Sequence, residues 1–361
     1  MISKGFFESL ELVANDRGLA IEDVLAKVEI AMAVACRESY SGDIKLDIDF
    51  EKKRIRVFEY KYVVEEFTEG AKGEISVEEA QALKPKSRIK PGMELKTEID
   101  FSKISRKAAA KFKNTFGNEL KNLEREEAYN FFNDKVGEII TATVNDVNPN
   151  FVTFVVAKNT FASMPISEGI PGEVFVPGEQ KKVYINKVEK TTKGPKIYLC
   201  RNNKEIVKRL FELTIPEISD GTIEIMGISR DAGSRTKIGV LATKPNLDPK
   251  GACVGQGGLR IKSINEALNN EKIDIFTWKN DPIDLVAEAL LPARSLSVMI
   301  DDPKAKKATV IVRDDQFSLA IGRAGQNVRL ASFAIDWRID IKRFSDALKE
   351  GIDFKYNVIQ K

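Results

Sequence analysis

Apolar residues recur with helical spacing in the first part of the chain. One stripe runs from Phe6 to Val13 at intervals of three or four residues, and Gly18 interrupts it. A second stripe with the same spacing runs from Ile21 to Ala35. Because residues three and four apart share a face of an α-helix, this part of the chain is predicted to form two amphipathic helices.

A hairpin and then a long helix are predicted next. From Ile44 to Val57 apolar and polar residues alternate on either side of a Glu-Lys-Lys turn, which is typical of two paired strands. Residues 84–93 contain two prolines and a glycine and are predicted to be a loop. Over residues 102–135 apolar residues recur at every third or fourth position. At about 1.5 Å per residue this helix would span about 50 Å, so we expect it to act as a connector.

The region from Gly137 to about residue 201 has a β-type pattern. Five short apolar or alternating segments are separated by Gly, Pro and Asn, at residues 138–147, 151–156, 160–166, 182–190 and 196–200. Five short strands within a segment of this size are typical of a small barrel of the OB type.

The rest of the chain contains an internal repeat. Gly255 and Gly322 are 67 residues apart, and the segment VGQGG around the first matches IGRAG around the second. The strand-like segment KIDIF has a counterpart in RIDIK, and two further strand-like segments precede each glycine cluster. Each unit is therefore predicted to be strand, strand, helix, glycine turn, helix, strand.

In each repeat an apolar residue precedes the pattern G-x-x-G and a polar helix start follows it. Glycine is required where the backbone φ is positive or where a side chain would block a close approach. The free N–H groups at a helix N-terminus bind phosphate readily. These are the requirements of a KH domain, whose GxxG loop holds about four nucleotides of RNA. The chain has neither a GxxxxGK[ST] P-loop nor a GxGxxG dinucleotide turn.

The predicted RNA-contacting residues are those of the two loops and the helix starts that follow them. They are Gly255, Gln256, Gly257, Gly258, Arg260 and Lys262 in the first repeat, and Gly322, Arg323, Ala324, Gly325, Gln326 and Arg329 in the second.

Composition narrows the possible chemistry. The 361 residues carry a net charge of only +3, so any nucleic-acid surface must come from local basic patches. The absence of histidine excludes histidine-based nucleophile pairs and metal sites, and the three cysteines form no CxxC pair. Asp301–Asp302 and Asp314–Asp315 are interpreted as turn and helix-cap residues. We therefore predict no metal site, no cofactor and no catalytic residue.

The location of the protein is predicted from what the sequence lacks. No apolar run is long enough to span a bilayer, which requires about 18 residues. Acidic residues appear too close to the start of the chain for a signal peptide, in which an apolar segment follows a basic start. We therefore expect a cytoplasmic protein.

Several segments resemble one bacterial family. GSRTKIGV, DPKGACVGQGGLRI, NNEKIDIFTW, LLPA and DDQFSLAIGRAGQNVRLAS are similar to the NusA family of transcription termination/antitermination factors, and the resemblance covers essentially the whole chain. It implies an amino-terminal polymerase-binding domain with a long helix, an S-one-type OB domain and two KH domains. It also implies binding to RNA polymerase near the RNA exit channel and to nascent RNA, with modulation of pausing, termination and antitermination.

The first glycine loop departs from the family pattern. Gly257 stands where the family often has a basic residue, although Arg260 matches the family's arginine after the loop. The second loop keeps Arg323, so we expect it to bind RNA more tightly than the first.

The predicted barrel offers a further RNA surface. If the residues alternating with Phe151 face the core, Phe151 is exposed and could stack on a base, with Phe161 on the next strand as its partner. Packing of both rings in the core or at its rim is the alternative. Lys182 and Arg201 are candidate phosphate contacts of the same surface, and a solvated charge is the alternative for each.

A basic run marks the start of the long helix. It consists of Lys103, Arg106, Lys107, Lys111 and Lys113, which are the candidate polymerase-binding residues. Contact with RNA or a merely solvated helix face are the alternatives.

The predicted fold class is multidomain α+β. An α/β amino-terminal RNA polymerase-binding domain occupies residues 1–136 and includes the long helix at about 102–135. A five-stranded OB-type β-barrel occupies 137–203. Two tandem KH domains of type II occupy 204–286 and 287–361.

The favoured function is a non-catalytic transcription elongation factor. It is expected to be a monomer that binds RNA polymerase and nascent single-stranded RNA, with other antitermination factors as further candidate partners. A general RNA chaperone or ribosome-associated RNA-binding protein without polymerase contact is the alternative. Phosphorolytic exoribonucleases also combine KH and S-one-type domains, but in the reverse order and after large catalytic domains, which argues against an enzyme.

Overall fold

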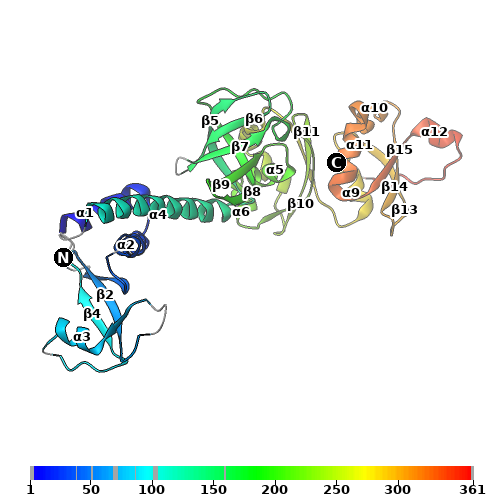
Figure 1. Ribbon diagram of the computed structural model, residues 1–361. Helices are drawn as coiled ribbons and strands as arrows, with labels where there is room; N and C mark the ends of the chain where they lie inside the picture. Colours follow the sequence, from blue (N-terminus) through cyan, green and yellow to red (C-terminus); the bar gives the residue numbers. More distant parts are fainter. Residues whose placement is uncertain are drawn as a thin grey trace. The chain divides into compact units, whose positions relative to one another are not determined.

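The chain folds into two compact units in the computed structural model (Figure 1). The described residues are 4–37, 39–49, 52–67, 72–85, 87–100, 105–157 and 160–358. One unit comprises Met1–Phe131 with Lys190–Pro195, and the other comprises Phe132–Glu189 with Lys196–Lys361.

The first unit begins with the elements that periodicity predicts. Helices α1 (Lys4–Arg17) and α2 (Ile21–Cys36) confirm the two amphipathic helices. Strands β1 (Asp43–Asp49) and β2 (Arg54–Val64) form the antiparallel hairpin. The helices and the inner face of this hairpin share one hydrophobic core.

The sequence patterns did not predict three short elements of this unit. They are β3 (Glu74–Ser76), α3 (Val77–Leu83) and β4 (Glu94–Glu98). Strand β3 runs parallel to β2, whereas β4 runs antiparallel to it. Elements of this length contain too few residues for a clear periodic signal, so pairing with β2 decides their structure.

Helix α4 (Arg106–Asn133) is the predicted long helix. Leu120 and Leu123 are buried in the same core as α1 and α2, and the rings of Phe112 and Phe116 stack with centroids 5.7 Å apart. The apolar stripe that identified this helix is therefore covered by the rest of the first unit.

The second unit starts with a closed five-stranded barrel. Its strands are β5 (Ile139–Val147), β6 (Phe151–Val155), β7 (Phe161–Pro165), β8 (Gln180–Thr191) and β9 (Gly194–Cys200), in the order β5-β6-β7-β9-β8. Val152 and Phe154 are fully buried, so the residues alternating with Phe151 do face the core. The five predicted strands are confirmed, with ends displaced by up to two residues.

Two units with the same sheet topology follow the barrel. The first contains α5 (Lys204–Thr214), α6 (Pro216–Ser219), β10 (Ile223–Asp231), β11 (Arg235–Ala242), α7 (Pro249–Val254), α8 (Leu259–Ala267) and β12 (Lys272–Thr277). The second contains α9 (Pro282–Ala289), β13 (Ser295–Asp302), β14 (Lys307–Val312), α10 (Phe317–Ile321), α11 (Gln326–Ile335), β15 (Arg338–Arg343) and α12 (Phe344–Lys349). In each sheet the first two strands are antiparallel and the third is parallel to the second. This arrangement is the type II KH fold that the repeat predicted.

Two buried ion pairs lie where the barrel meets the first KH unit, and their arginines donate across this boundary to backbone carbonyl oxygens. The Arg201 guanidinium is 2.7 Å from Glu173, and both side chains are only 1% exposed. Arg230 pairs with Glu271 at 2.8 Å and also donates to the backbone carbonyl oxygen of Arg201. Because an unpaired charge in such a site is costly, these contacts fix the two modules against each other.

The second KH unit packs on the sheet of the first. Helix α11 lies against β10, where a Cβ on Gly227 would be 2.0 Å from the carbonyl oxygen of Ala334. No side chain larger than hydrogen can therefore occupy position 227 without separating the helix from the sheet.

Candidate nucleic-acid interface

Both glycine loops have the backbone geometry that only glycine adopts easily. Gly255 and Gly322 have φ of 75° and 77°. A Cβ would lie 2.7 Å from Arg260 Cγ at the first position and 2.7 Å from the backbone nitrogen of Asn327 at the second. The first glycine of each loop is therefore required both by its positive φ and by the close approach of the following helix.

Each loop ends at a helix start without a capping side chain. Gly258 precedes α8 and Gly325 precedes α11, both in the left-handed conformation, and neither N-terminus receives a side-chain cap. The N–H groups of the first helical turn need an acceptor. A phosphate oxygen is the acceptor that such a positively polarised terminus favours.

The cations around the two loops are not equivalent. Arg260 is engaged by the Glu217 carboxylate at 2.8 Å and by the Ala252 carbonyl at 2.7 Å, and it packs over Gly255. Lys262 is exposed and lies 3.9 Å from Glu266. In the second loop Arg323 is exposed and has no ion-pair partner within the described part of the chain. The side chain most available to a phosphate is therefore that of Arg323.

The other two predicted residues of the second loop contact the first KH unit. Gln326 donates to Asp231 at 2.6 Å and to Ser234 at 2.8 Å, and Arg329 donates to Asp231 at 3.1 Å. Asp231 and Ser234 flank the turn between β10 and β11. These side chains therefore join the two KH units as well as bordering the loop.

The two loops also differ at their third position. Gly257 has φ of 60° and a Cβ there would meet nothing within 4 Å. The equivalent residue, Ala324, adopts φ of 49°. Both Gly257 and its neighbour Gln256 are exposed, so the first loop offers open backbone but no cationic side chain.

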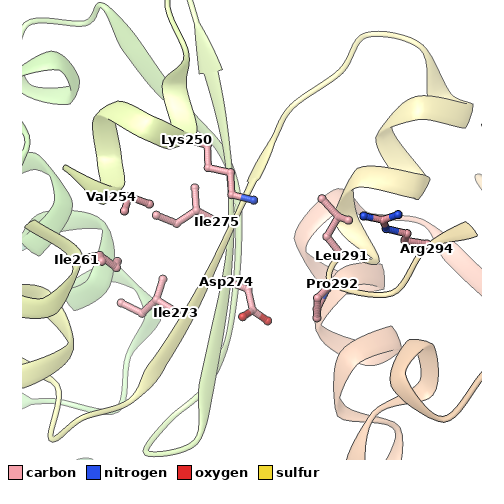
Figure 2. Close-up of a pocket in the computed structure, with 9 residues that line it drawn as sticks. All are labelled: Lys250, Val254, Ile261, Ile273, Asp274, Ile275, Leu291, Pro292 and Arg294. Atoms are coloured by element: carbon pink, nitrogen blue, oxygen red, sulfur yellow. The ribbon is translucent and has the colours of Figure 1, made fainter. Parts of the chain in front are cut away.

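An apolar groove of about 500 Å³ lies beside the first loop (Figure 2). Val254, Ile261, Ile273 and Ile275 form its apolar wall. Strand β12 is an edge strand, so one row of its backbone N–H and C=O groups faces away from the sheet. An apolar wall beside unpaired backbone groups suits a nucleobase, which has an apolar face and a polar edge.

Three charged residues at this groove were not among the predicted site residues. Lys250, Asp274 and Arg294 line it together with Leu291 and Pro292. The repeat located the strand that carries Asp274, but the segment of Arg294 lies far along the sequence from the loop. Only the packing of the second KH unit on the first brings it there.

The two aromatic residues of the barrel are exposed but are not neighbours. Phe151 is 43% and Phe161 is 59% exposed. In the β6–β7 register, Phe151 is opposite Pro165 and Phe161 is opposite Val155. Four residues of strand therefore separate the two rings, roughly 13 Å. The expectation that they form a pair is wrong, because the hairpin places them at opposite ends of one face.

The predicted phosphate contact at Arg201 is corrected by its burial. Its guanidinium is bound by Glu173, by the Ala267 carbonyl at 2.9 Å and by the Lys182 carbonyl. No part of this group is available to RNA. Lys182 itself is exposed, and its amine donates to Thr141 at 2.8 Å.

The basic run on α4 is only partly described. Arg106, Lys107 and Lys113 are exposed and Lys111 is half-buried. Lys103 lies outside the described residues. The role of these residues in binding stays a prediction.

The acidic pairs have structural partners, but Asp314–Asp315 do not cap α10 as predicted, because the N-cap position of that helix is Gln316 and no side chain caps it. Asp302 accepts from the backbone N–H groups of Lys304 and Ala305, as in a turn, and Asp301 accepts from Thr309. The backbone N–H of Ser345 lowers the pKa of Asp314, and Arg313 lowers the pKa of Asp315. Within the described ranges no three acidic, cysteine or histidine side chains are grouped so as to hold a metal ion.

The cysteines are buried thiols. Burial raises the pKa of Cys253 to about 12 and that of Cys200 to about 11. Thiols of this kind stay protonated at neutral pH, so they lack the thiolate that a nucleophile needs.

Three family models match the chain. A NusA N-terminal domain matches residues 5–126, a NusA-like first KH domain matches 201–278, and a NusA-like second KH domain matches 282–349.

None of the helices in the described residues is long and apolar enough to cross a membrane.

Full-length relatives give the same assignment. The chain is 38% identical to the transcription termination/antitermination protein NusA of Bacillus subtilis over 97% of this chain and 94% of the relative. It is 38% identical to the protein of the same name from Halalkalibacterium halodurans, over 96% and 90%. It is 36% identical to that from Thermus thermophilus, over 92% and 88%. With these matches, a barrel of the OB type and two type II KH units, the chain belongs to the NusA family.

Proposed function

We propose that this protein is a transcription elongation factor that binds nascent RNA and RNA polymerase and modulates pausing, termination and antitermination. The observation that carries the proposal is the pair of uncapped glycine turns in two KH units within one compact unit with the barrel. Three weak RNA-binding surfaces in one body raise the effective concentration of RNA at each of them.

The amino-terminal unit is proposed to bind RNA polymerase. Its support is the family match over residues 5–126 and the basic first turns of α4. We also propose a monomeric, cytoplasmic and non-catalytic protein with the domain boundaries stated above, and other antitermination factors as further partners. The buried, protonated thiols and the acidic pairs that are engaged in local hydrogen bonds favour a binding role over catalysis.

The RNA interface is proposed to include the two glycine loops with Lys262 and Arg323, the barrel residues Phe151 and Phe161, and Lys182. Arg260 acts there by positioning the first loop, because its guanidinium is held by Glu217. Arg201 is left out because it is buried.

A reconstituted transcription reaction tests this function. The full chain is added to purified bacterial RNA polymerase on a template with a hairpin-dependent pause and terminator. We expect co-purification with the polymerase after nuclease treatment and a change in pause lifetime and read-through. Binding to RNA with no retention on polymerase would favour the RNA chaperone instead, and degradation of the RNA in the presence of phosphate and magnesium would identify an enzyme.

A further inference from the structure

The side chain that follows the second glycine loop is held by the other KH unit. Gln326 comes directly after Gly325 and is the first residue of α11. Its amide nitrogen donates to Asp231 Oδ2 at 2.6 Å and to Ser234 Oγ at 2.8 Å. Asp231 ends β10 and Ser234 directly precedes β11, both in the first KH unit. The turn between these two strands therefore fixes the point at which the second loop becomes a helix.

Asn327, the next residue, adds a second connection. It is buried, and its Nδ2 donates at 3.0 Å to the carbonyl oxygens of Leu290 and Ala320. Ala320 lies in α10 just before the loop, and Leu290 directly follows α9. The carbonyl oxygen of Leu291 accepts a hydrogen bond from Lys237 of the first KH unit. The start of α11 is therefore linked to the first KH unit through two neighbouring side chains.

The first loop obtains its contacts within its own KH unit. The matching segments VGQGGLRI and IGRAGQNV place Leu259 at the position of Gln326 and Arg260 at that of Asn327. Leu259 is 68% exposed, and its side chain has no polar atom. Arg260 donates to two acceptors of the same unit. Among the described residues, support from the other KH unit is therefore a feature of the second loop.

The charge of Asp231 can be separated from its role as an acceptor. Its Oδ2 also accepts from Arg329 Nη2 at 3.1 Å, so the carboxylate is paired with a cation of α11. An exposed ion pair of this kind contributes little to folding. The oxygen of an asparagine amide could accept from Gln326 in the same place without carrying a charge.

We propose that Asp231 and Ser234 are positioning residues for RNA binding by the second loop. They hold the N-terminus of α11 in the orientation that receives a phosphate, so the RNA affinity of the second KH unit depends on a turn in the first. A preorganised site binds more tightly because less freedom is lost on binding. The inference rests on the proposed RNA-binding function and adds to it two residues outside both glycine loops.

The test measures the affinity of the full chain for a single-stranded RNA of mixed sequence by fluorescence anisotropy at several salt concentrations. In a variant with both D231A and S234A the affinity should fall about tenfold, because two hydrogen bonds that orient the helix are lost. The slope of log affinity against log salt concentration should not decrease, because no phosphate contact is removed. D231N should bind at least as tightly as the wild type, since its amide oxygen still accepts from Gln326.

D302A is the matched control. Asp302 ends β13 as Asp231 ends β10, and its carboxylate accepts from N–H groups of its own turn. The RNA affinity of D302A should stay within about twofold of the wild type, as for other surface changes.

Q326A separates positioning from direct contact with RNA. If Gln326 acts through the turn, Q326A should lose as much affinity as the variant with D231A and S234A. All three changes together should then lose no more than either variant does by itself. This comparison also holds if removal of Asp231 and Ser234 lowers the melting temperature.

Four results would overturn the positioning role while RNA binding by the wild type stands. They are unchanged affinity in the variant with D231A and S234A, a smaller salt slope in that variant, an equal loss in D231N, and additive losses with Q326A. If the wild type does not bind the RNA, the proposed function fails as well.

Discussion

The buried amine of Lys237 donates a hydrogen bond of 2.8 Å to the carbonyl oxygen of Leu291. Lys237 lies on β11 in the first KH unit, and Leu291 lies between α9 and β13 at the start of the second. The side chain is 1% exposed, and this burial lowers the pKa of Lys237 to about 8. A buried lysine whose pKa is near 8 therefore links the two KH units at their junction.

This pKa predicts a rise of stability with pH. Between about pH 8 and the ordinary value of 10.5, the unfolded lysine binds a proton that the folded one has lost, so the free energy of unfolding increases. The difference in unfolding free energy between wild type and K237M should change by about 3 kcal/mol across this range. Denaturant unfolding at several pH values measures it. K262M, which removes an exposed lysine, should show no such dependence.

Substituting the two glycines of the second loop should cause a loss of RNA binding. Gly322→Asp together with Gly325→Asp places two β-carbons at positive φ and two carboxylates where the phosphate would bind. We expect the affinity for single-stranded RNA to fall at least about tenfold, while retention on RNA polymerase persists. Filter binding and polymerase co-purification measure the two properties.

Gly257→Ala is the matched control for these changes. Its Cβ meets open space, and Ala324 already adopts the same backbone region in the other loop. RNA affinity should stay within about twofold of the wild type, since a single alanine at positive φ costs only about 1 kcal/mol. Unchanged RNA affinity in the variant with both Gly322→Asp and Gly325→Asp would show that the second loop is not the site.

The two arginines next to the loops should have different effects. Arg323 is exposed, so R323A should reduce the slope of log affinity against log salt concentration by about one and leave the melting temperature unchanged. Arg260 is held by Glu217 and Ala252, so R260A should lower the melting temperature. Salt titrations with one RNA and thermal melts separate the two roles. Equal salt slopes for R323A and wild type would contradict the assignment of Arg323.

The buried pair of Arg201 and Glu173 predicts a stability effect. R201A leaves the buried Glu173 carboxylate with the Lys181 amine, 3.5 Å away, as its remaining ion-pair partner, and the loss should cost up to about 3–5 kcal/mol of unfolding free energy. Replacing both partners with apolar residues, as in R201M with E173L, should restore most of that loss. K182A serves as the exposed control and should not change the unfolding free energy. Chemical denaturation measures the unfolding free energies. An R201A protein that is as stable as the wild type but binds RNA more weakly would instead support Arg201 as a phosphate contact.

The separation of the two barrel phenylalanines predicts additive effects. If each ring stacks on its own base, F151A and F161A should each cost about 1–3 kcal/mol of RNA-binding free energy. Since roughly 13 Å of strand separates them, the double variant should show the sum of the two losses within about 0.5 kcal/mol. Isothermal titration with a single-stranded RNA gives all three values. A double variant no weaker than either single variant would indicate one shared base.

The sequence by itself determined the elements and their order. Stripes such as Ile21–Ala35 and the alternation around Phe151 identify a buried face by period alone, and α2 and β6 confirm them. The glycines of both loops were also identifiable, because a positive φ restricts the residue type at that single position. These are local properties, which neighbouring residues in the chain decide.

Tertiary structure alone decided which charged side chains are accessible to RNA. An arginine at the end of a strand has the same sequence signature whether it is solvated or buried, and only the packing of Glu173 and Ala267 around Arg201 removes it from the RNA surface. The junction likewise brings Arg294 to face Asp274, although 20 residues separate them in the chain. Burial and charge pairing are set by contacts distant in sequence, so no local pattern records them.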